Sequence, residues 1–402
     1  MIRAASGVRR ATDGATDTAS TATYDWHGVV GIKVLDWKRS DIRNVETQLG
    51  LERAQLDRLP DLTIRYVDRL PLPGELTYLS DGAAFAGDAF VLTAGADRRP
   101  VMQVPFGSLG SKCDIMLVRG LSSIPLLVPI LNLTALRTGY LPVNAAAFEY
   151  DGVGVLVAGG ARGGKTGTLL AFMSQGATFV GDDWVLVHRD GRAMYGLPTP
   201  MQVNDADLRA LPEYRARLDV RTKRRIRMMS SLLRLERCLP AHSSRTSIVA
   251  RARARVRARL VAGLKAQVSP HRLFGAAARF GAGAPDIVFL ARSVESPRIS
   301  VSPIRPTDLV RRLVPLLEYE WRELDRYYTL FRAAFPGRRN EFIESKTKHL
   351  EAGLQFALKE KRTYEVSYPS AVPISDVLRT LEPFICGDGI ASEPRVQGVV
   401  AE

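Results

Sequence analysis

The sequence is poor in cysteine and has no long hydrophobic run. Its 402 residues include three cysteines, none in a Cys-x-x-Cys pair, which excludes a local zinc knuckle and indicates a reducing compartment. The most apolar run, residues 124–131, contains two prolines and is far shorter than the ~20 residues that span a bilayer. We therefore expect a buried segment there and no transmembrane segment. The five histidines show no spacing such as His-Glu-x-x-His, which argues against a transition-metal site.

The N-terminal residues also lack the apolar stretch of a signal peptide. Residues 1–23 are small, polar and rich in Thr and Ala, a composition typical of a disordered tail. Together with the cysteine usage, this favours a cytoplasmic protein. The chain is long enough for two or three domains.

The whole chain carries a net charge of +14, and acidic residues are scarce in one region of it. Basic residues are concentrated between positions 209 and 272, first at 221–227 and then at 251–259, where Arg alternates with Ala and Val. A helix of this composition is ringed with charge. An acidic peptide or protein partner and a solvated insertion without a partner fit equally well, and an anionic membrane surface ranks behind them. No aromatic residue lies within 215–270, so nucleic acid ranks last.

The most informative pattern is a glycine-rich loop between an apolar strand and a helix. Residues 159–166, here called the phosphate loop, read Gly-Gly-Ala-Arg-Gly-Gly-Lys-Thr and match the G-x-x-x-x-G-K-[ST] pattern at every fixed position. In such a loop, backbone N–H groups and a helix N-terminus converge on phosphate. We expect ATP and Mg²⁺ here, with Lys165 on the β/γ-phosphates and the Thr166 hydroxyl on the metal. The predicted nucleotide-binding residues are Gly159, Gly160, Ala161, Arg162, Gly163, Gly164, Lys165, Thr166 and Gly167.

Two adjacent carboxylates, Asp182 and Asp183, follow the apolar run 178–180. Phosphoryl transfer needs charge neutralisation on the phosphates and orientation of the nucleophile, and a carboxylate at a strand end can hold Mg²⁺ while its neighbour accepts a proton. We therefore predict that one carboxylate of this pair binds Mg²⁺ and that the other accepts a proton. The alternative is a polar turn between two strands.

These segments resemble the catalytic core of HPr kinase/phosphorylase. The resemblance covers about residues 144–190 and rests on 151–157, on the phosphate loop and on 175–183, with the family's spacing between loop lysine and aspartate pair. That family embeds its phosphate loop in a fold related to phosphoenolpyruvate carboxykinases and phosphorylates a serine hydroxyl of a partner protein. The resemblance implies that Lys165 binds phosphates, that Thr166 binds Mg²⁺ and that one of Asp182 and Asp183 is the base. We favour Asp183 as the base and Asp182 as its support. The predicted catalytic residues are therefore Asp183, Asp182 and Lys165, and the predicted metal ligands are Thr166 and Asp182. Family members are often oligomers, so a homo-oligomer is an expectation.

Two departures separate this chain from the family. Asn144 stands where the family has a histidine, and asparagine carries no proton near neutral pH, which argues against the reverse, phosphorylase-type activity. The family's Glu-x-Arg-Gly motif is not recognisable after residue 200. The chain therefore resembles the divergent HPr-kinase-like proteins, some of which phosphorylate serine in small peptides or other acceptors.

The predicted architecture is α/β, with an HPr kinase/phosphoenolpyruvate carboxykinase-like core. We expect the tail at 1–23, a small α+β domain at 24–110, the phosphate-loop core at 111–204, a basic helical insertion at 205–280 and a C-terminal part completing the core at 281–402. The patterns predict strands at 28–34, 62–67, 76–79, 89–93, 114–119, 145–150, 152–158, 178–180, 184–187, 286–291 and 363–368, and helices at 41–58, 124–138, 166–174, 309–335 and 374–384.

The predicted function is an ATP- and Mg²⁺-dependent kinase that transfers the γ-phosphate to a hydroxyl, preferably serine, of a peptide, protein or small molecule. Two alternatives stay open. A nucleotide-binding regulatory or scaffold protein without kinase activity is favoured by Asn144 and by the missing downstream motif. A plain NTPase would need a water-positioning residue and an arginine supplied in trans, and no pattern in the sequence indicates either.

Overall fold

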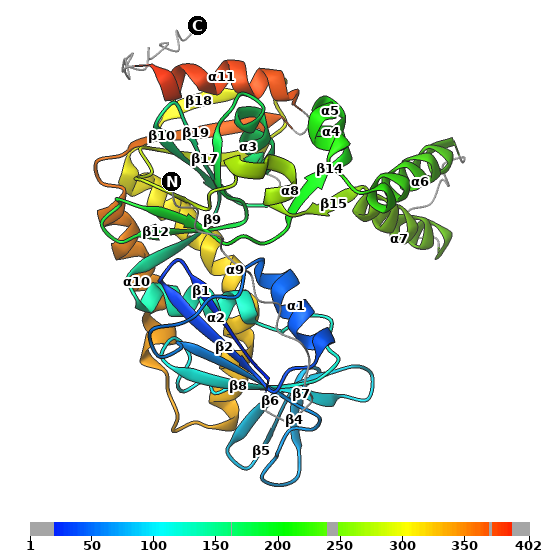
Figure 1. Cartoon of the computed structure of the whole chain (residues 1–402), viewed down its shortest axis with the longest axis vertical. Helices are drawn as coiled ribbons and strands as arrows, with labels where there is room; N and C mark the ends of the chain where they lie inside the picture. The colour runs from blue at the N-terminus through cyan, green and yellow to red at the C-terminus, as the bar shows by residue number, and fades with distance from the viewer. Residues whose placement is uncertain (1–19, 162, 239–247, 370–371, 388–402) are drawn as a thin grey trace, which may run out of the picture.

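The structure, a computed structural model, describes residues 20–161, 163–238, 248–369 and 372–387. The described part is mixed α/β, as predicted, and contains an eight-stranded and a nine-stranded sheet. Figure 1 shows the two sheets stacked along the long axis of the molecule, with a helical arm at one side. The predicted tail lies mostly outside the described residues, but strand β1 begins inside it, at Thr21.

The eight-stranded sheet is formed by the N-terminal part of the chain. Its strand order is β1-β2-β3-β8-β7-β6-β5-β4, with β2, β3 and β8 parallel. Buried aromatic and branched side chains such as Tyr24, Trp26 and Ile32 form its core together with helices α1 and α2. The elements are β1 (Thr21–Trp26), β2 (Val30–Leu35), α1 (Arg39–Leu49), β3 (Leu62–Val67), β4 (Thr77–Ser80), β5 (Ala83–Ala86), β6 (Ala89–Ala94), β7 (Arg99–Gln103), β8 (Cys113–Val118) and α2 (Leu127–Arg137).

Two predicted helices are longer than the observed ones. Helix α1 ends at Leu49 and not at residue 58, because Gly50 adopts a left-handed φ of 66° that terminates helices. A Cβ atom on Gly50 would lie 1.7 Å from the carbonyl oxygen of Pro198, so only glycine fits there. Helix α2 starts three residues later than predicted, after Leu126, which also has a left-handed backbone.

The nine-stranded sheet contains the phosphate loop. Its order is β16-β13-β12-β9-β10-β17-β19-β18, and β11 pairs with β9. Strands β10, β17 and β19 are parallel, so their carboxyl ends meet at one edge of the sheet. The strands are β9 (Tyr140–Tyr150), β10 (Val153–Gly159), β11 (Thr178–Gly181), β12 (Trp184–His188), β13 (Met194–Gly196), β16 (Gly281–Ala282), β17 (Ile287–Val294), β18 (Ser300–Pro303) and β19 (Arg362–Pro369).

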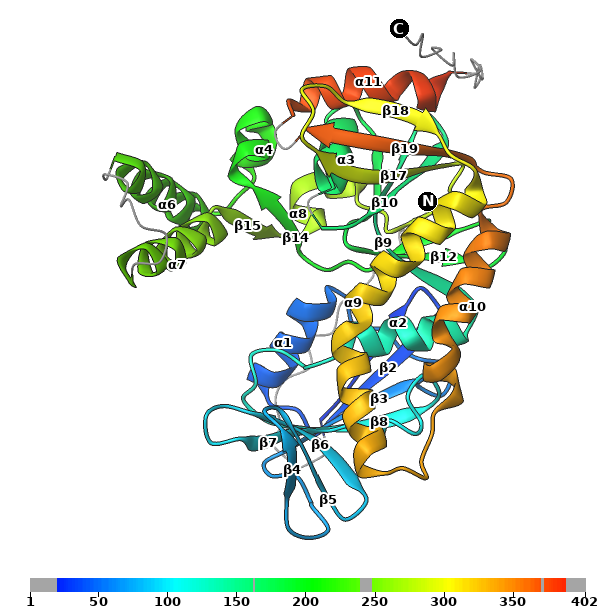
Figure 2. The ribbon, with the colours of Figure 1, turned by 180° about the vertical axis from the view of Figure 1, so that it is seen from behind.

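Helices cover both faces of this sheet. Helices α3 (Lys165–Met173) and α11 (Ile374–Cys386) pack on one face, and α9 (Pro306–Ala334) and α10 (Glu341–Ala357) pack on the other. Helix α9 also joins the two sheets: its Leu309 and Leu313 lie in the core of the nine-stranded sheet, whereas Tyr328 and Phe331 lie in the core of the N-terminal sheet. Figure 2 shows α9 running along both sheets. Helix α10 is not among the predicted helices, although Asn340 caps its start and its buried Ile343, Leu350 and Leu354 recur at helical spacing.

The arm is formed by the basic segment. Strands β14 (Met201–Asn204) and β15 (Lys265–Val268) pair as its stem, and helices α6 (Val220–Cys238) and α7 (Ile248–Gly263) project from it (Figure 2). The predicted helical character is thus confirmed over α6 and α7, while residues 239–247 lie outside the described part. Short helices α4 (Asp205–Ala210), α5 (Pro212–Ala216) and α8 (Pro270–Phe274), with the 3₁₀ turn η1 (Gly275–Ala277), flank the stem. None of the described helices combines the length and apolar character that crossing a bilayer requires.

Candidate functional site

The phosphate loop connects the end of β10 to the start of α3. Gly159 and Gly164 have positive φ angles of 148° and 90°, which side-chain-bearing residues rarely adopt. A Cβ atom on Gly159 would lie 2.3 Å from the carbonyl oxygen of Ala291 on β17, and one on Gly164 would lie 2.8 Å from the ring of Tyr368 on β19. The loop is therefore packed against the ends of two neighbouring strands, and glycine is required for steric reasons. Arg162 lies outside the described residues.

Lys165, the first residue of α3, turns back over this loop. Its Nζ donates hydrogen bonds to the carbonyl oxygens of Gly159 at 2.8 Å and Gly160 at 2.9 Å. Burial lowers the pKa of Lys165, and the nearby Asp182 and Asp183 carboxylates partly offset this effect. An ammonium group whose hydrogen bonds go to neutral carbonyls would gain binding free energy by exchanging them for phosphate oxygens, because hydrogen bonds between charged groups are stronger.

Asp182 lies directly opposite the start of α3. The Thr166 hydroxyl lies 3.1 and 3.2 Å from the two carboxylate oxygens of Asp182. The side chain is 7% exposed, and burial together with the charge of Asp183 raises the pKa of Asp182 to about 7. Asp182 is therefore a buried carboxylate whose charge the protein only partly compensates, which is characteristic of functional sites.

Asp183 differs from its neighbour because its side chain reaches solvent. Its backbone has a left-handed φ of 83°, a conformation that costs about 1–3 kcal/mol in a residue other than glycine. The amide nitrogen Nδ2 of Asn144 donates a hydrogen bond to Asp183 Oδ1 at 3.2 Å. Protein atoms around the carboxylate raise the pKa of Asp183, and the charge of Lys165 and the bond from Asn144 act in the opposite direction.

The sheet register explains why Asn144 meets Asp183. Strand β9 starts at Tyr140, earlier than the predicted strand at 145–150, and pairs with β12 so that Asn144 lies opposite Trp184. The backbone N–H of Ala145 donates to the carbonyl oxygen of Asp183 at 3.0 Å. Asn144 thus belongs to the same site as the aspartate pair.

The structure brings most of the predicted site residues together at one edge of the nine-stranded sheet. Lys165 lies within electrostatic range of both aspartates, and Thr166 contacts Asp182. Gly163 packs against Ala291, whereas a Cβ atom on Gly160 or Gly167 would meet no backbone atom within 4 Å. Ala161 is an exposed loop residue.

Two further residues, Tyr368 and Glu320, lie at this site without any signal in the sequence. The Tyr368 hydroxyl lies 2.7 Å from that of Thr168 on α3, which fixes the start of the helix against β19. The carboxylate of Glu320 on α9 acts electrostatically on Lys165. Both residues are far from the loop along the chain, so no spacing could indicate them. His188, at the other end of β12, instead contacts Asp190.

The available ligands suit magnesium better than a transition metal. Within the described ranges, no group of three or more His, Cys, Asp and Glu residues is placed to hold a metal ion. The Thr166 hydroxyl and the Asp182 carboxylate are hard oxygen donors, and Mg²⁺ is typically bound by one or two such groups together with waters and substrate phosphates. The residues present therefore fit Mg²⁺ bound with a nucleotide.

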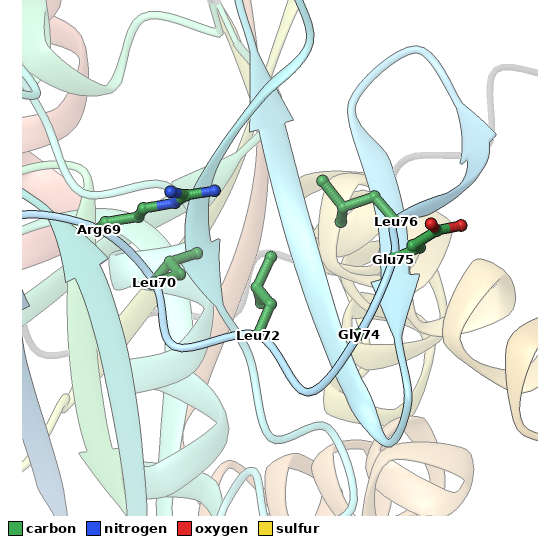
Figure 3. Close-up of a pocket in the computed structure, with 6 residues that line it drawn as sticks. All are labelled: Arg69, Leu70, Leu72, Gly74, Glu75 and Leu76. Atoms are coloured by element: carbon green, nitrogen blue, oxygen red, sulfur yellow. The ribbon is translucent and has the colours of Figure 1, made fainter.

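A cavity of about 460 Å³ lies elsewhere, beside the connection between β3 and β4. Figure 3 shows its lining residues along that connection: Arg69, Leu70, Leu72, Gly74, Glu75 and Leu76. None of the predicted site residues lines it, so it plays no part in the candidate site.

No protein-family model matches this sequence, and a search of curated proteins finds no significant match either. The function is therefore inferred from the geometry and chemistry of the site.

Proposed function

We propose that this chain is an ATP- and Mg²⁺-dependent kinase with an HPr-kinase-like core, which transfers the γ-phosphate to a hydroxyl group. Serine in a peptide or protein is the favoured acceptor, with small-molecule hydroxyls as the other class. The observation that carries the proposal is the contact of Thr166 with the buried Asp182, next to a solvent-accessible Asp183. Phosphoryl transfer requires this combination of a metal-binding carboxylate and a proton acceptor beside a phosphate loop.

The loop and Lys165 would bind the nucleotide phosphates. Lys165 Nζ would exchange the carbonyl oxygens of Gly159 and Gly160 for phosphate oxygens, and the N-terminus of α3 would add its partial positive charge. Thr166 and Asp182 would hold the metal. When bound, MgATP would supply the phosphoryl group, and its Mg²⁺ would neutralise much of the negative charge on the phosphates.

Asp183 would act as the base for the acceptor hydroxyl. The hydroxyl proton would move to the Asp183 carboxylate, which the Asn144 amide orients through its hydrogen bond. The surrounding protein atoms raise the pKa of Asp183 and make it a better proton acceptor, while Lys165 and Asn144 favour its ionised form. Asn144 itself would not transfer a proton.

The arm would recruit the acceptor. Arg255, Arg257 and Arg259 on α7 are exposed, and exposed Val256 and Val261 lie among them. Such a surface suits an acidic peptide or protein segment with some apolar side chains, because opposite charge steers the encounter. The cysteine usage agrees with a cytoplasmic location for this enzyme.

Mass spectrometry tests the kinase proposal directly. Wild-type protein would be incubated with MgATP and with small peptides and proteins encoded near its gene, and we expect an acceptor that gains one phosphate. Asp183→Asn should slow the transfer about 10²–10⁴-fold, as the loss of a general base does. Asp190→Asn should transfer at the wild-type rate, because Asp190 lies at the opposite end of β12 and contacts His188. Transfer at the wild-type rate by Asp183→Asn would exclude Asp183 as the base.

A second candidate function is a nucleotide-binding regulatory or scaffold protein. Asn144 favours it, because the position beside Asp183 carries an amide instead of the family's proton carrier. This alternative predicts MgATP binding without a phosphorylated product and without ATP hydrolysis, so the same experiment separates the two functions. ATP hydrolysis without any acceptor would indicate a plain NTPase.

A further inference from the structure

Two arginines from distant parts of the chain share one glutamate beside the phosphate loop. The side chain of Glu365 on β19 is 13% exposed. Its Oε1 forms an ion pair with Arg292 Nε on β17 at 3.0 Å, and its Oε2 accepts a hydrogen bond from Arg312 on α9 at 2.9 Å. Arg292 Nε also donates to the Ser367 hydroxyl at 2.9 Å. Two positive charges thus meet one negative charge, and the side chains of Arg292 and Arg312 remain 57% and 54% exposed.

The arginine pair lies close to the phosphate loop. Arg292 directly follows Ala291, the residue whose carbonyl oxygen packs against Gly159 and Gly163. Arg312 lies one helical turn before Leu316, whose side chain is 3.8 Å from a Cβ position on Gly160. Glu365 therefore holds both guanidinium groups at the edge of the sheet where β10, β17 and β19 end.

This arrangement has the features of an anion site and not of a simple surface ion pair. A single exposed pair contributes little to stability, but here one nearly buried carboxylate binds two arginines through separate oxygens. The pair keeps a net positive charge and exposed guanidinium groups, and arginine is the side chain best suited to phosphate geometry. None of the motifs in the sequence indicates these residues.

We propose that Arg292 and Arg312, positioned by Glu365, form a phosphate-binding subsite next to the phosphate loop. The phosphate comes from one of two sources, the terminal phosphate of the bound nucleotide or a separate phosphate group, either inorganic or on a second substrate. The first source rests on the proposed function, whereas the second requires only the arginine pair.

Binding measurements on single variants test this subsite. Calorimetric titration of ATP and of ADP, each with Mg²⁺, and ³¹P NMR titration of inorganic phosphate would be made on wild type, Arg292→Ala and Arg312→Ala. Loss of one charge-assisted contact should weaken binding about tenfold or more. A loss for ATP with ADP unchanged assigns the subsite to the terminal phosphate, whereas a loss for inorganic phosphate with both nucleotides unchanged assigns it to a separate phosphate group.

Two further variants provide the controls. Arg311→Ala removes a neighbouring, more exposed arginine that contacts Asp308 and should leave all three affinities unchanged. Glu365→Gln keeps the side-chain volume but frees both arginines, so it should weaken phosphate binding while thermal unfolding reports that the fold is retained.

The proposal is overturned if both arginine variants bind ATP, ADP and phosphate as wild type does. If phosphate binding is also unchanged in both arginine variants, nucleotide binding that depends on Lys165 but on neither arginine would remove the subsite and leave the proposed function intact. A wild-type protein that binds no nucleotide would instead remove the proposed function, and the phosphate titration would still decide on the subsite.

Discussion

Each of the two large sheets is associated with a buried aspartate, and the two aspartates have very different surroundings. Asp41 of α1, beside the N-terminal sheet, is 1% exposed and accepts hydrogen bonds from the backbone N–H groups of Lys38 at 3.0 Å and Gly120 at 3.3 Å, with Arg119 as its ion-pair partner. Asp182 at the end of β11 is 7% exposed. Its carboxylate is stabilised by the Thr166 hydroxyl, by the charge of Lys165 and by the backbone N–H of Asp183, and is opposed by burial and by the charge of Asp183.

This difference separates a buried carboxylate that the fold itself compensates from one that it does not. Buried charges normally persist because they are paired and hydrogen-bonded, and Asp41 meets that requirement within the fold. Asp182 does not, since burial and a second carboxylate raise its pKa to about 7. A cation bound at Asp182 would supply the missing compensation. Asp182, beside the nine-stranded sheet, therefore retains an unfavourable electrostatic free energy, whereas Asp41, beside the N-terminal sheet, does not.

The largest effect is expected for Lys165→Ala. Loss of the ammonium group that lies between loop and aspartates should reduce phosphate transfer by a factor of about 10³–10⁵, because one cationic side chain on a transferring phosphoryl group contributes that much. The transfer rate under single-turnover conditions measures it. Lys38→Ala, which removes an exposed lysine near the N-terminal sheet, is the control and should transfer at the wild-type rate.

The same substitution at the two aspartates should have opposite effects on stability. Folding raises the pKa of Asp182 from 3.8 to about 7, so the native state binds the proton more tightly and stability falls as the pH rises from about 4 to 7. Asp182→Asn removes this penalty and should increase the free energy of unfolding at pH 8 by on the order of 2–4 kcal/mol. The gain should vanish near pH 4.

Asp41→Asn should instead destabilise the protein by about 1–3 kcal/mol, because an amide nitrogen cannot accept the bonds that the carboxylate accepts. Urea denaturation at several pH values measures both variants. A loss of stability in Asp182→Asn at pH 8 would contradict the difference drawn between the two aspartates.

A smaller effect is expected for Asn144→Ala. Its hydrogen bond lowers the pKa of Asp183, so its removal should raise that pKa and move the acidic limb of the pH–rate profile to higher pH. The rate on the alkaline plateau should change less than about tenfold, as expected for a group that orients the base without transferring a proton. Asn204→Ala in the arm, where Asn204 contacts Asp207, is the control. An unchanged profile in Asn144→Ala would show that Asn144 does not act on Asp183.

The smallest effect is expected in the arm. Replacing Arg255, Arg257 and Arg259 with Gln should raise the KM for an acidic acceptor about three- to tenfold at low salt, because exposed charges act mainly on encounter. The kcat and the affinity for MgATP should not change. Equal KM values in wild type and variant at low salt would mean that the arm does not recruit the acceptor.

The sequence predicts the local elements of the nine-stranded sheet well. Apolar β-branched runs indicate β10, β11, β12 and β17, and the glycine-lysine pattern indicates where α3 begins. The patterns fail where contacts between residues far apart in the sequence determine where an element begins or ends. Helix α1 stops at Gly50 because the Pro198 backbone lies against it, and β9 extends back to Tyr140 because β12 pairs with it.

The candidate site follows the same rule. Residues 159–166 and the aspartate pair are close along the chain and form recognisable patterns, so their neighbourhood can be predicted. The contacts of Asn144 with Asp183, of Tyr368 with Thr168 and of Glu365 with its two arginines join distant segments. They depend on strand order and register, which no single-sequence pattern contains.

Calorimetric titration of MgATP tests the central claim, that the strand ends of the nine-stranded sheet form a nucleotide-phosphate site. Wild type should bind MgATP at one site per chain, with affinity reduced when Mg²⁺ is removed or when Thr166→Val deletes the hydroxyl that contacts Asp182. Lys165→Ala should abolish the binding heat while thermal unfolding still reports a folded protein. MgATP binding of equal strength in wild type and Lys165→Ala would contradict the claim.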